Sequence, residues 1–196
     1  KIEALGGSSN AATGFDDVHF YVLVPPDKTK VALTYLLNLV LNPTINLNPF
    51  QTEREVVLEE IAQHQDQPEE QLFQSLLEKC WGRHSYGRPI LGNEESLRSL
   101  NPQKMRKFHS NRYVGRNITL SIAGQLPKGI KKFIESSELG NIEKGHNKEL
   151  LEELVTPLRF QKGRKEIHIS RLESGRIIMA WPCPPANKQE LVMGYD

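Results

Sequence analysis

Two glutamates stand out in the stretch EREVVLEEIAQH, which starts at Glu53. On an α-helix, residues seven apart lie about two turns along nearly the same face. Glu53 and Glu60 are such a pair, whereas the other two glutamates of the stretch point elsewhere. Val56 and Val57 lie on or beside the stripe that joins the pair, and a carboxylate among core residues is costly to desolvate unless it is paired or binds a metal. The spacing allows a metal-binding face, but helices carry Glu constantly, and on these residues alone an ordinary solvated helix face is the favoured interpretation.

His64 extends the pattern because it follows Glu60 by one turn, and Glu and His at that spacing can share a metal. A zinc site, however, needs three protein ligands and a second shell. The other five histidines are scattered, and none falls in an HExxH or HxxEH frame. The sequence has no GxSxG nucleophile elbow and no GxxxxGK[ST] phosphate loop. These residues therefore contain no complete metal site by themselves.

Composition places the chain among globular proteins. Its 196 residues suit one domain, or one domain and part of a second, and 38% of them are hydrophobic. The 25 Lys and Arg nearly balance the 24 Asp and Glu, so no basic field predicts a nucleic-acid partner. The longest apolar run, LTYLLNLVL, is far shorter than the ~20 residues of a membrane span, so we expect a soluble chain. Cys80 and Cys183 show no CxxC spacing, and we expect two isolated thiols packed as small hydrophobes.

Hydrophobic periodicity predicts the elements that must position the glutamates. DDVHFYVLVPP alternates as a strand, with Val18, Phe20, Val22 and Val24 on one face. RNITLSIAGQLP predicts a second strand, in which Ile118, Leu120 and Ile122 alternate. A helix is predicted before Pro43, and a long one from Thr52 to about His64. A third begins at Pro68 and continues through EEQLFQSLLEKCW, with Leu72, Phe73, Leu76 and Leu77 inward. Two short helices are predicted within NEESLRSLNPQKMRKFHSNRY, and one in KGIKKFIESS.

Local signals complete the expected organisation. Asn101 is predicted to cap a helix whose first turn contains Pro102. Residues 138–165 are polar and predict a loop or linker around the amphipathic turn ELLEELV, and EIHISRLESGRIIMAWP predicts a hairpin that turns at residues 173–175. The expected division is 1–137, the linker 138–165, and a hairpin with a truncated closing helix over 166–196. We expect an α+β fold, a mixed β-sheet with helices packed on one face.

The order of four blocks resembles that of the inverted-zincin metallopeptidases, the family of insulinase, pitrilysin and mitochondrial processing peptidase. LGGSSNAATGFDDVHFYV is similar to the family's Gly-Gly-x-x-Asn-Ala-x-Thr segment, and EREVVLEEI is similar to its glutamate helix. HSYGRPILGNEESL resembles the loop and helix that follow, and YVGRNITLSIAG resembles a later strand. The blocks cover roughly residues 5 to 125, and the remaining third resembles the end of the first family domain more weakly.

This resemblance implies roles for particular residues. The family's zinc is held by two His of an HxxEH helix and by a Glu on a later helix. That third ligand falls on Glu60, and the supporting carboxylate falls on Glu53. Family members bind substrate as a strand added to a sheet edge beside the zinc, and that edge falls on Asn10, Ala11 and Ala12. The alternative is that the Asn-Ala segment only shapes the start of a strand.

The resemblance also implies what these residues do not supply. The HxxEH helix would precede Lys1, so both His ligands and the general-base Glu are not among them, nor is the Arg/Tyr pair of the family's later domain. We therefore expect a fragment of the N-terminal catalytic-type domain of a zinc metallopeptidase that cleaves extended or unfolded peptides. The isolated chain is expected to be inactive and without Zn²⁺. Expected partners are peptides, a second homologous domain or subunit, and further copies of the chain.

Two alternatives stay open on the sequence. The first is a non-catalytic peptide-binding or scaffolding subunit of the same fold, and reading the sequence upstream for HxxEH would separate it from a peptidase. The second is an unrelated α+β binding domain, for which Glu60 would be exposed to solvent with no groove beside it.

Overall fold

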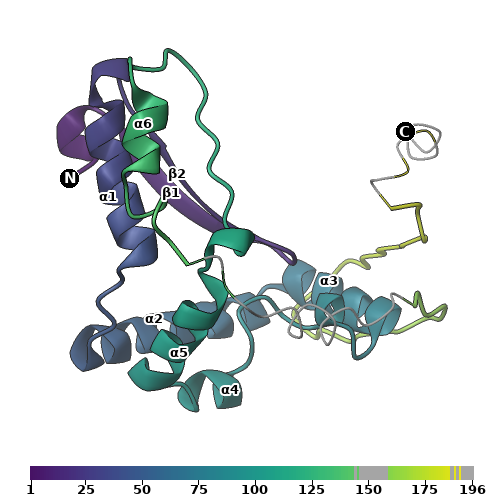
Figure 1. The fold of residues 1–196 in the computed structure, drawn as a ribbon. Coiled ribbons are helices and arrows are strands. Elements are labelled where there is room, and N and C mark those ends of the chain that lie inside the picture. Colours follow the sequence, from purple (N-terminus) through teal and green to yellow (C-terminus); the bar gives the residue numbers. More distant parts are fainter. Residues whose placement is uncertain (144, 146–158, 186–187, 189, 191–196) are drawn as a thin grey trace. The chain divides into compact units, whose positions relative to one another are not determined.

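The computed structural model describes residues 1–143, 145, 159–185, 188 and 190 (Figure 1). The chain forms two compact units. The first combines Lys1–Val56 with Glu95–Glu153, and the second combines Val57–Glu94 with Leu154–Asp196. Helix α2 (Leu47–Asp66) begins in the first unit and ends in the second. In its described part the protein contains helices and an antiparallel strand pair, which confirms the α+β class.

The first unit contains the sheet. Strand β1 (Ser8–Thr13) pairs antiparallel with β2 (Val18–Leu23), with Asn10 opposite Tyr21. Strand β2 contacts α1 (Thr29–Leu41), and its Phe20 and Val22 are half-buried, while Tyr21 between them is exposed. This confirms the predicted alternation for Phe20, Val22 and Val24, whereas Val18 at the start of β2 is exposed. All six residues of β1 are exposed, and β2 is its one partner strand among the described residues.

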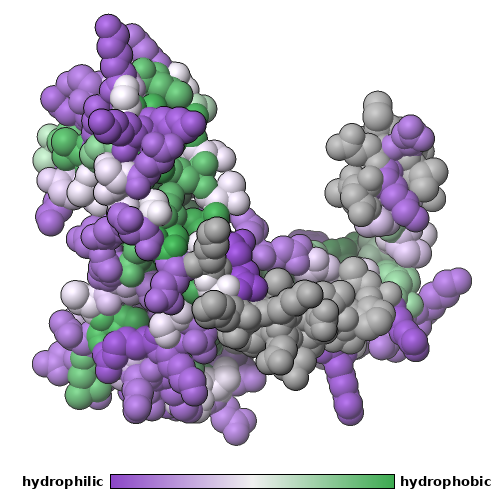
Figure 2. Space-filling view, viewed as in Figure 1, coloured by the Kyte–Doolittle hydropathy of each residue, from purple (hydrophilic) through white to green (hydrophobic). Residues whose placement is uncertain are grey.

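Helix α1 is apolar on nearly every side. It buries Ala32, Leu33 and Leu37, yet Leu39 is 66% exposed, and Val31 and Tyr35 are also exposed. Figure 2 shows hydrophobic residues reaching the surface among hydrophilic ones. A helix that is hydrophobic all round normally has neighbours on all sides. The described core is correspondingly small, and its buried hydrophobic residues are Ala32, Leu33, Leu37, Ile61 and Cys80.

Three shorter helices follow in sequence, α4 (Glu94–Arg98), α5 (Pro102–Arg112) and α6 (Ile130–Glu135). The predicted cap of α5 is confirmed, because the Asn101 side-chain oxygen accepts a 2.9 Å hydrogen bond from the Lys104 N–H. His109 Nε2 donates to the Val40 carbonyl at 2.7 Å. Arg106 donates to the Ile45 carbonyl at 2.6 Å. These two contacts attach α5 to the chain that leaves α1.

The second unit is built on α3 (Pro68–Trp81), which begins at Pro68 as predicted. A short 3-10 turn (Ser85–Gly87) packs beside it, and Gln74 on α3 donates to the Gly87 carbonyl at 3.0 Å. The Trp81 ring meets Tyr86 edge-on at a centroid distance of 6.0 Å. The loop after α3 is therefore folded back onto the helix.

Two strand predictions are wrong for the described residues. Ile118, Leu120 and Ile122 are half-buried and alternate with exposed residues, and the backbone at Ile118 is extended, but no strand forms there. Residues 166–182 contain no ladder either, although the chain turns at Ser170–Arg171 and bends at residues 173–174, within the predicted turn. An alternating pattern specifies a face, whereas a strand needs hydrogen bonds from a neighbour. The parallel pairing of a mixed sheet is likewise not found in the part of the chain that the structure describes.

Smaller predictions also need correction. Helix α2 begins at Leu47 and not at Thr52, because Pro49 lies in its first turn, where the missing N–H costs no intrahelical bond. Phe73 is 44% exposed and does not point inward. Cys80 is buried as expected, whereas Cys183 is exposed. The amphipathic turn ELLEELV lies outside the described residues, as does the closing helix except for Glu190.

None of the helices over the described residues combines the length and the apolar character that crossing a membrane requires.

Candidate functional site

Both candidate carboxylates lie on α2. The helix runs for 20 residues from Leu47 to Asp66, so Glu53 and Glu60 share it as predicted. Both side chains are exposed, and Val56, on the stripe between them, is 53% exposed. The buried residue of this helix is Ile61. The stripe that carries the pair therefore faces solvent in this chain, and the expected cost of desolvating two acids among core residues does not arise.

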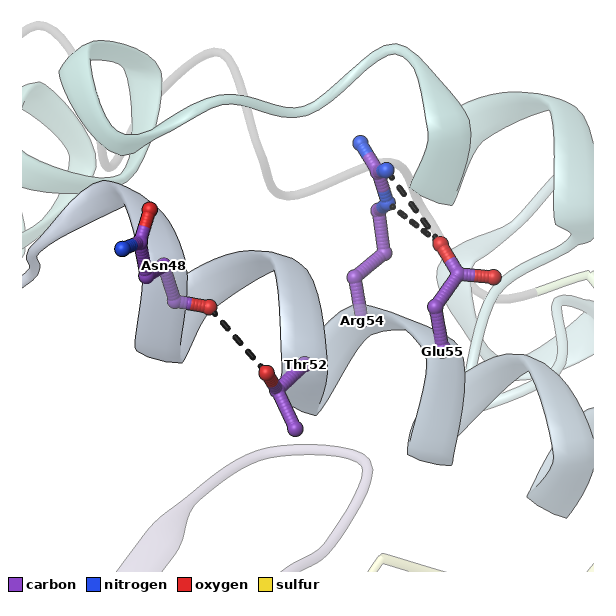
Figure 3. A network of polar contacts seen from close by, with 4 residues as sticks. All are labelled: Asn48, Thr52, Arg54 and Glu55. Atoms are coloured by element: carbon purple, nitrogen blue, oxygen red, sulfur yellow. Dashed lines mark hydrogen bonds and ion pairs between the residues drawn. The ribbon is translucent and has the colours of Figure 1, made fainter.

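The acidic residues of α2 differ in whether they have a charged partner. Figure 3 shows Arg54 reaching Glu55, with Nε and Nη2 at 3.3 and 3.2 Å from one carboxylate oxygen. The same view shows the Thr52 hydroxyl donating to the Asn48 carbonyl at 3.2 Å, a contact internal to the helix. Among the described residues, Glu53 and Glu60 have neither a hydrogen bond nor an ion pair. Their oxygens are therefore free to accept an outside partner.

His64 has a different neighbour from the one considered on the sequence. Its Nδ1 lies 3.8 Å from a carboxylate oxygen of Glu70, which belongs to the first turn of α3. The Gln71 side chain also crosses this corner and donates to the Gln65 carbonyl. His64 thus helps to hold the turn between two helices. Helical periodicity could not have identified Glu70, since Pro68 breaks the helix between them.

A complete metal site is not present in the part of the chain that the structure describes. No group of three His, Cys, Asp or Glu side chains is gathered closely enough there to hold an ion. Zinc in proteins takes carboxylate, imidazole or thiolate ligands, usually four in a structural site and three in a catalytic one. Glu60 fits one ligand position by its chemistry and its freedom from partners. The residues described here fit part of a zinc site and not the whole.

The segment predicted as a substrate edge lies on β1, which has one neighbouring strand among the described residues. Asn10, Ala11 and Ala12 occupy the middle of β1 and all are exposed. The Asn10 side-chain oxygen accepts a 2.8 Å hydrogen bond from the Ala11 N–H. A Cβ on Gly7 would lie 2.4 Å from the Leu23 carbonyl oxygen, so the glycine is needed where β1 begins beside β2. Gly7 therefore has a structural role, while Asn10, Ala11 and Ala12 remain open to solvent.

The sequence did not predict a shallow pocket in the first unit. It lies between the start of α2 and the start of α5 and is lined by Ile45, Asn46, Leu47, Asn101, Pro102, Gln103 and Arg106. No acidic residue lines it, and Arg106 already donates to a backbone carbonyl. None of the predicted site residues belongs to it.

Two family models together match nearly the whole chain. Residues 1–94 match the model described as insulinase (peptidase family M16), and residues 99–195 match the model described as peptidase M16 inactive domain. The glutamate helix and β1 lie in the first match.

Curated relatives match the chain over part of their length. An uncharacterized zinc protease of Mycobacterium leprae is 33% identical over 125 residues, which cover 64% of this chain and 28% of that protein. The uncharacterized zinc protease YmxG of Bacillus subtilis is 31% identical over 135 residues, which cover 69% of this chain and 33% of that protein. The chain thus spans about a third of the length of these relatives.

A solved structure shares the fold. A protease from Helicobacter pylori superposes with a TM-score of 0.69 at 19% identity, covering 81% of this chain and 37% of that one. At this identity the likeness concerns the fold alone.

Proposed function

Because the chain belongs to the insulinase (M16) peptidase family, we propose that it is part of a zinc-dependent peptidase that cleaves extended or unfolded peptides. Family membership excludes the unrelated α+β binding domain, even though Glu60 is exposed as that alternative required. The observation that carries the proposal is the position of Glu60, an exposed carboxylate on the matched glutamate helix with no partner among the described residues.

Glu60 supplies one carboxylate ligand to the zinc in this proposal. Carboxylate oxygens bind Zn²⁺ at about 2.0–2.2 Å, and a free carboxylate needs no partner displaced before it binds. Glu53 lies on the same face and orients a neighbouring group or ligand through its own oxygens. Zinc, when bound, polarises a peptide carbonyl and activates water. In this proposal the remaining ligands and the general base are not among the residues that the structure describes.

The edge of β1 receives the substrate. An extended peptide can add to a sheet edge through main-chain hydrogen bonds, and small side chains let the two backbones approach closely. Ala11 and Ala12 are small and exposed, and β1 has one neighbouring strand among the described residues. The Ala11 N–H donates to the Asn10 side-chain oxygen. A carbonyl of a bound peptide would take the place of this oxygen, and the Asn10 side chain can rotate away to allow it.

We further propose that the isolated 196-residue chain does not hydrolyse peptides. Glu60 is one ligand, and a single carboxylate cannot hold zinc in a tetrahedral site. The proposed enzyme needs a second homologous domain or subunit to complete the site. The mitochondrial-processing peptidase subunit beta of Dictyostelium discoideum, 26% identical over 149 residues, is named as a subunit.

A second candidate is a non-catalytic subunit of the same fold that binds or presents peptides. Residues 99–195 match the family model described as peptidase M16 inactive domain. This description favours keeping the non-catalytic subunit as a candidate. The presence of both Glu53 and Glu60 favours the peptidase, since a subunit released from catalysis need not keep its metal-binding residues.

Hydrolysis of an unfolded peptide by the natural gene product separates the two candidates. For the peptidase, Glu60→Gln lowers kcat/KM by about 100-fold or more, because the metal loses a ligand. Glu59→Gln is the matched control, since it removes the same charge from the adjacent exposed position, and it leaves hydrolysis within about twofold. A wild-type gene product that binds peptide and does not cleave it would support the non-catalytic subunit.

A further inference from the structure

Helices α2 and α3 meet at a corner made by a single residue in the second unit. Helix α2 ends at Asp66 and α3 begins at Pro68, so Gln67 alone lies between them. The Gln67 backbone is extended (φ −90°, ψ 118°), a conformation that a following proline favours over the helical one. The ladder of α2 therefore stops at this corner, and its last carbonyls need partners from outside the helix.

Residues at the start of α3 supply these partners. The half-buried Gln71 side-chain amide donates to the Gln65 carbonyl. The Gln67 N–H donates to the His64 carbonyl at 3.1 Å. His64 Nδ1 in turn lies 3.8 Å from a carboxylate oxygen of Glu70. The last turn of α2 is thus closed against the first turn of α3.

Helix α3 is itself held at both ends by residues 160–176. Arg176 pairs with Glu69, in the first turn of the helix, at 3.5 Å. At the last turn, the Gln161 N–H donates at 2.8 Å to the Cys80 carbonyl, one of the carbonyls that a helix end leaves unpaired. The corner is therefore closed against a helix that has its own attachments within the second unit.

Glu60 lies one helical turn before the closed end of α2. In an α-helix the N–H of each residue bonds to the carbonyl four residues earlier, so the Glu60 carbonyl is the ladder partner of the His64 N–H. Ile61, next to Glu60, is 6% exposed and is held by packing. Opening of the last turn of α2 would remove the backbone bond at Glu60 and change the direction in which its carboxylate points.

We propose that Gln71 is a positioning residue for the Glu60 carboxylate, a role that rests on the proposed function of Glu60 as a zinc ligand. Gln71 acts through the end of α2 and not on the metal. A site residue has to be held within about 0.5 Å and 10–20° of its productive geometry. A ligand that is in place for only part of the time lowers the apparent affinity by that fraction. Closing the end of α2 therefore raises the zinc affinity without adding a ligand.

Zinc affinity of the natural gene product, measured by competition with a chelator, tests this role. Gln71→Met keeps the length of the side chain and removes its donor. It lowers the affinity about three- to tenfold, less than the loss of a group that contacts a metal ligand directly.

Gln74→Met is the matched control. Gln74 lies on the same helix, is also half-buried and also donates to a backbone carbonyl, that of Gly87, at 3.0 Å. Its loss weakens the loop after α3 and leaves the zinc affinity within about twofold of the wild type. Equal zinc affinities for Gln71→Met and Gln74→Met would overturn the positioning role.

Glu60→Gln in the same assay separates this role from the proposed function. Wild-type zinc affinity in Glu60→Gln would overturn the proposed function, and the role of Gln71 with it. Loss of zinc from Glu60→Gln together with unchanged affinity in Gln71→Met would overturn the positioning role alone.

Hydrogen exchange of the 196-residue chain supplies a measurement that needs no zinc. Gln71→Met raises the exchange rates of the amides of residues 64–66 about fivefold, the effect of one net hydrogen bond. Gln74→Met leaves the rates of these three amides unchanged. Unchanged rates at residues 64–66 in Gln71→Met would show that Gln71 does not hold the end of α2 and would overturn the proposal.

Discussion

Glu53 and Glu60 project from the same face of one uninterrupted helix, about 10.5 Å apart along its axis, and neither has a partner among the described residues. A third acid of the same helix, Glu55, is paired with Arg54. Glu53 and Glu60 thus keep their carboxylates free, as Glu59 also does, while Glu55 is neutralised. Their position on one face of the helix, two turns apart, is what distinguishes the pair from Glu59.

Glu53→Gln is expected to weaken zinc binding by the natural gene product by about 10- to 100-fold, the usual effect of losing a group that orients a metal ligand. Glu55→Gln is the control, because its pairing with Arg54 is exposed and such pairs contribute little. Competition with a zinc chelator measures both affinities. Equal affinities for the two variants would remove the supporting role of Glu53.

The isolated chain is expected to bind zinc weakly, because the described residues offer no group of three ligands. Calorimetric titration of the purified 196-residue chain checks this. Tight binding of one zinc per chain would mean that further ligands exist within it. His64→Ala would then be the first variant to examine.

Leu33→Ala is expected to destabilise the first unit by about 2–5 kcal/mol, the usual cost of a cavity in a core. Leu33 is 4% exposed on α1, where few buried neighbours can compensate. Leu39→Ala, on the same helix and 66% exposed, should change the free energy of unfolding by less than about 0.5 kcal/mol. Urea unfolding followed by circular dichroism compares them, and similar costs would contradict the described core.

The Asn101 cap is expected to contribute about 1 kcal/mol, so Asn101→Ala should lower the free energy of unfolding by that amount. Asn101→Asp keeps an oxygen that can accept the Lys104 N–H and should be close to neutral. The midpoints of thermal unfolding of the two variants report the difference. A loss of stability in both would show that the amide acts through something other than the cap.

Elements fixed by local chemistry were predictable from the sequence. Pro68 and Pro102 each mark a helix start, and Asn101 supplies the cap of α5, because these residues act on the backbone beside them. The half-buried Phe20 and Val22 of β2 follow from simple alternation. The glutamate pair was likewise readable, since helical spacing alone places both residues on one face.

Features that depend on distant partners were not predictable. Ile118, Leu120 and Ile122 are half-buried and alternate with exposed residues, as the sequence predicted. A strand also needs a hydrogen-bonded neighbour, and the periodicity of a short segment does not identify one. The contact of His64 with Glu70 depends on a proline-broken corner between two helices. The contacts of residues 160–176 with α3 join positions 79 to 107 apart in sequence, and no local rule pairs them.

Zinc content of the natural gene product tests the role of Glu60 most directly. The protein is purified without added metal, dialysed against a weak chelator and analysed for zinc by mass spectrometry. We predict about one zinc per catalytic unit in the wild type and in Glu59→Gln, and less than about one tenth of that in Glu60→Gln. Full zinc occupancy in Glu60→Gln, with its helix intact by circular dichroism, would contradict the assignment of Glu60 as a metal ligand.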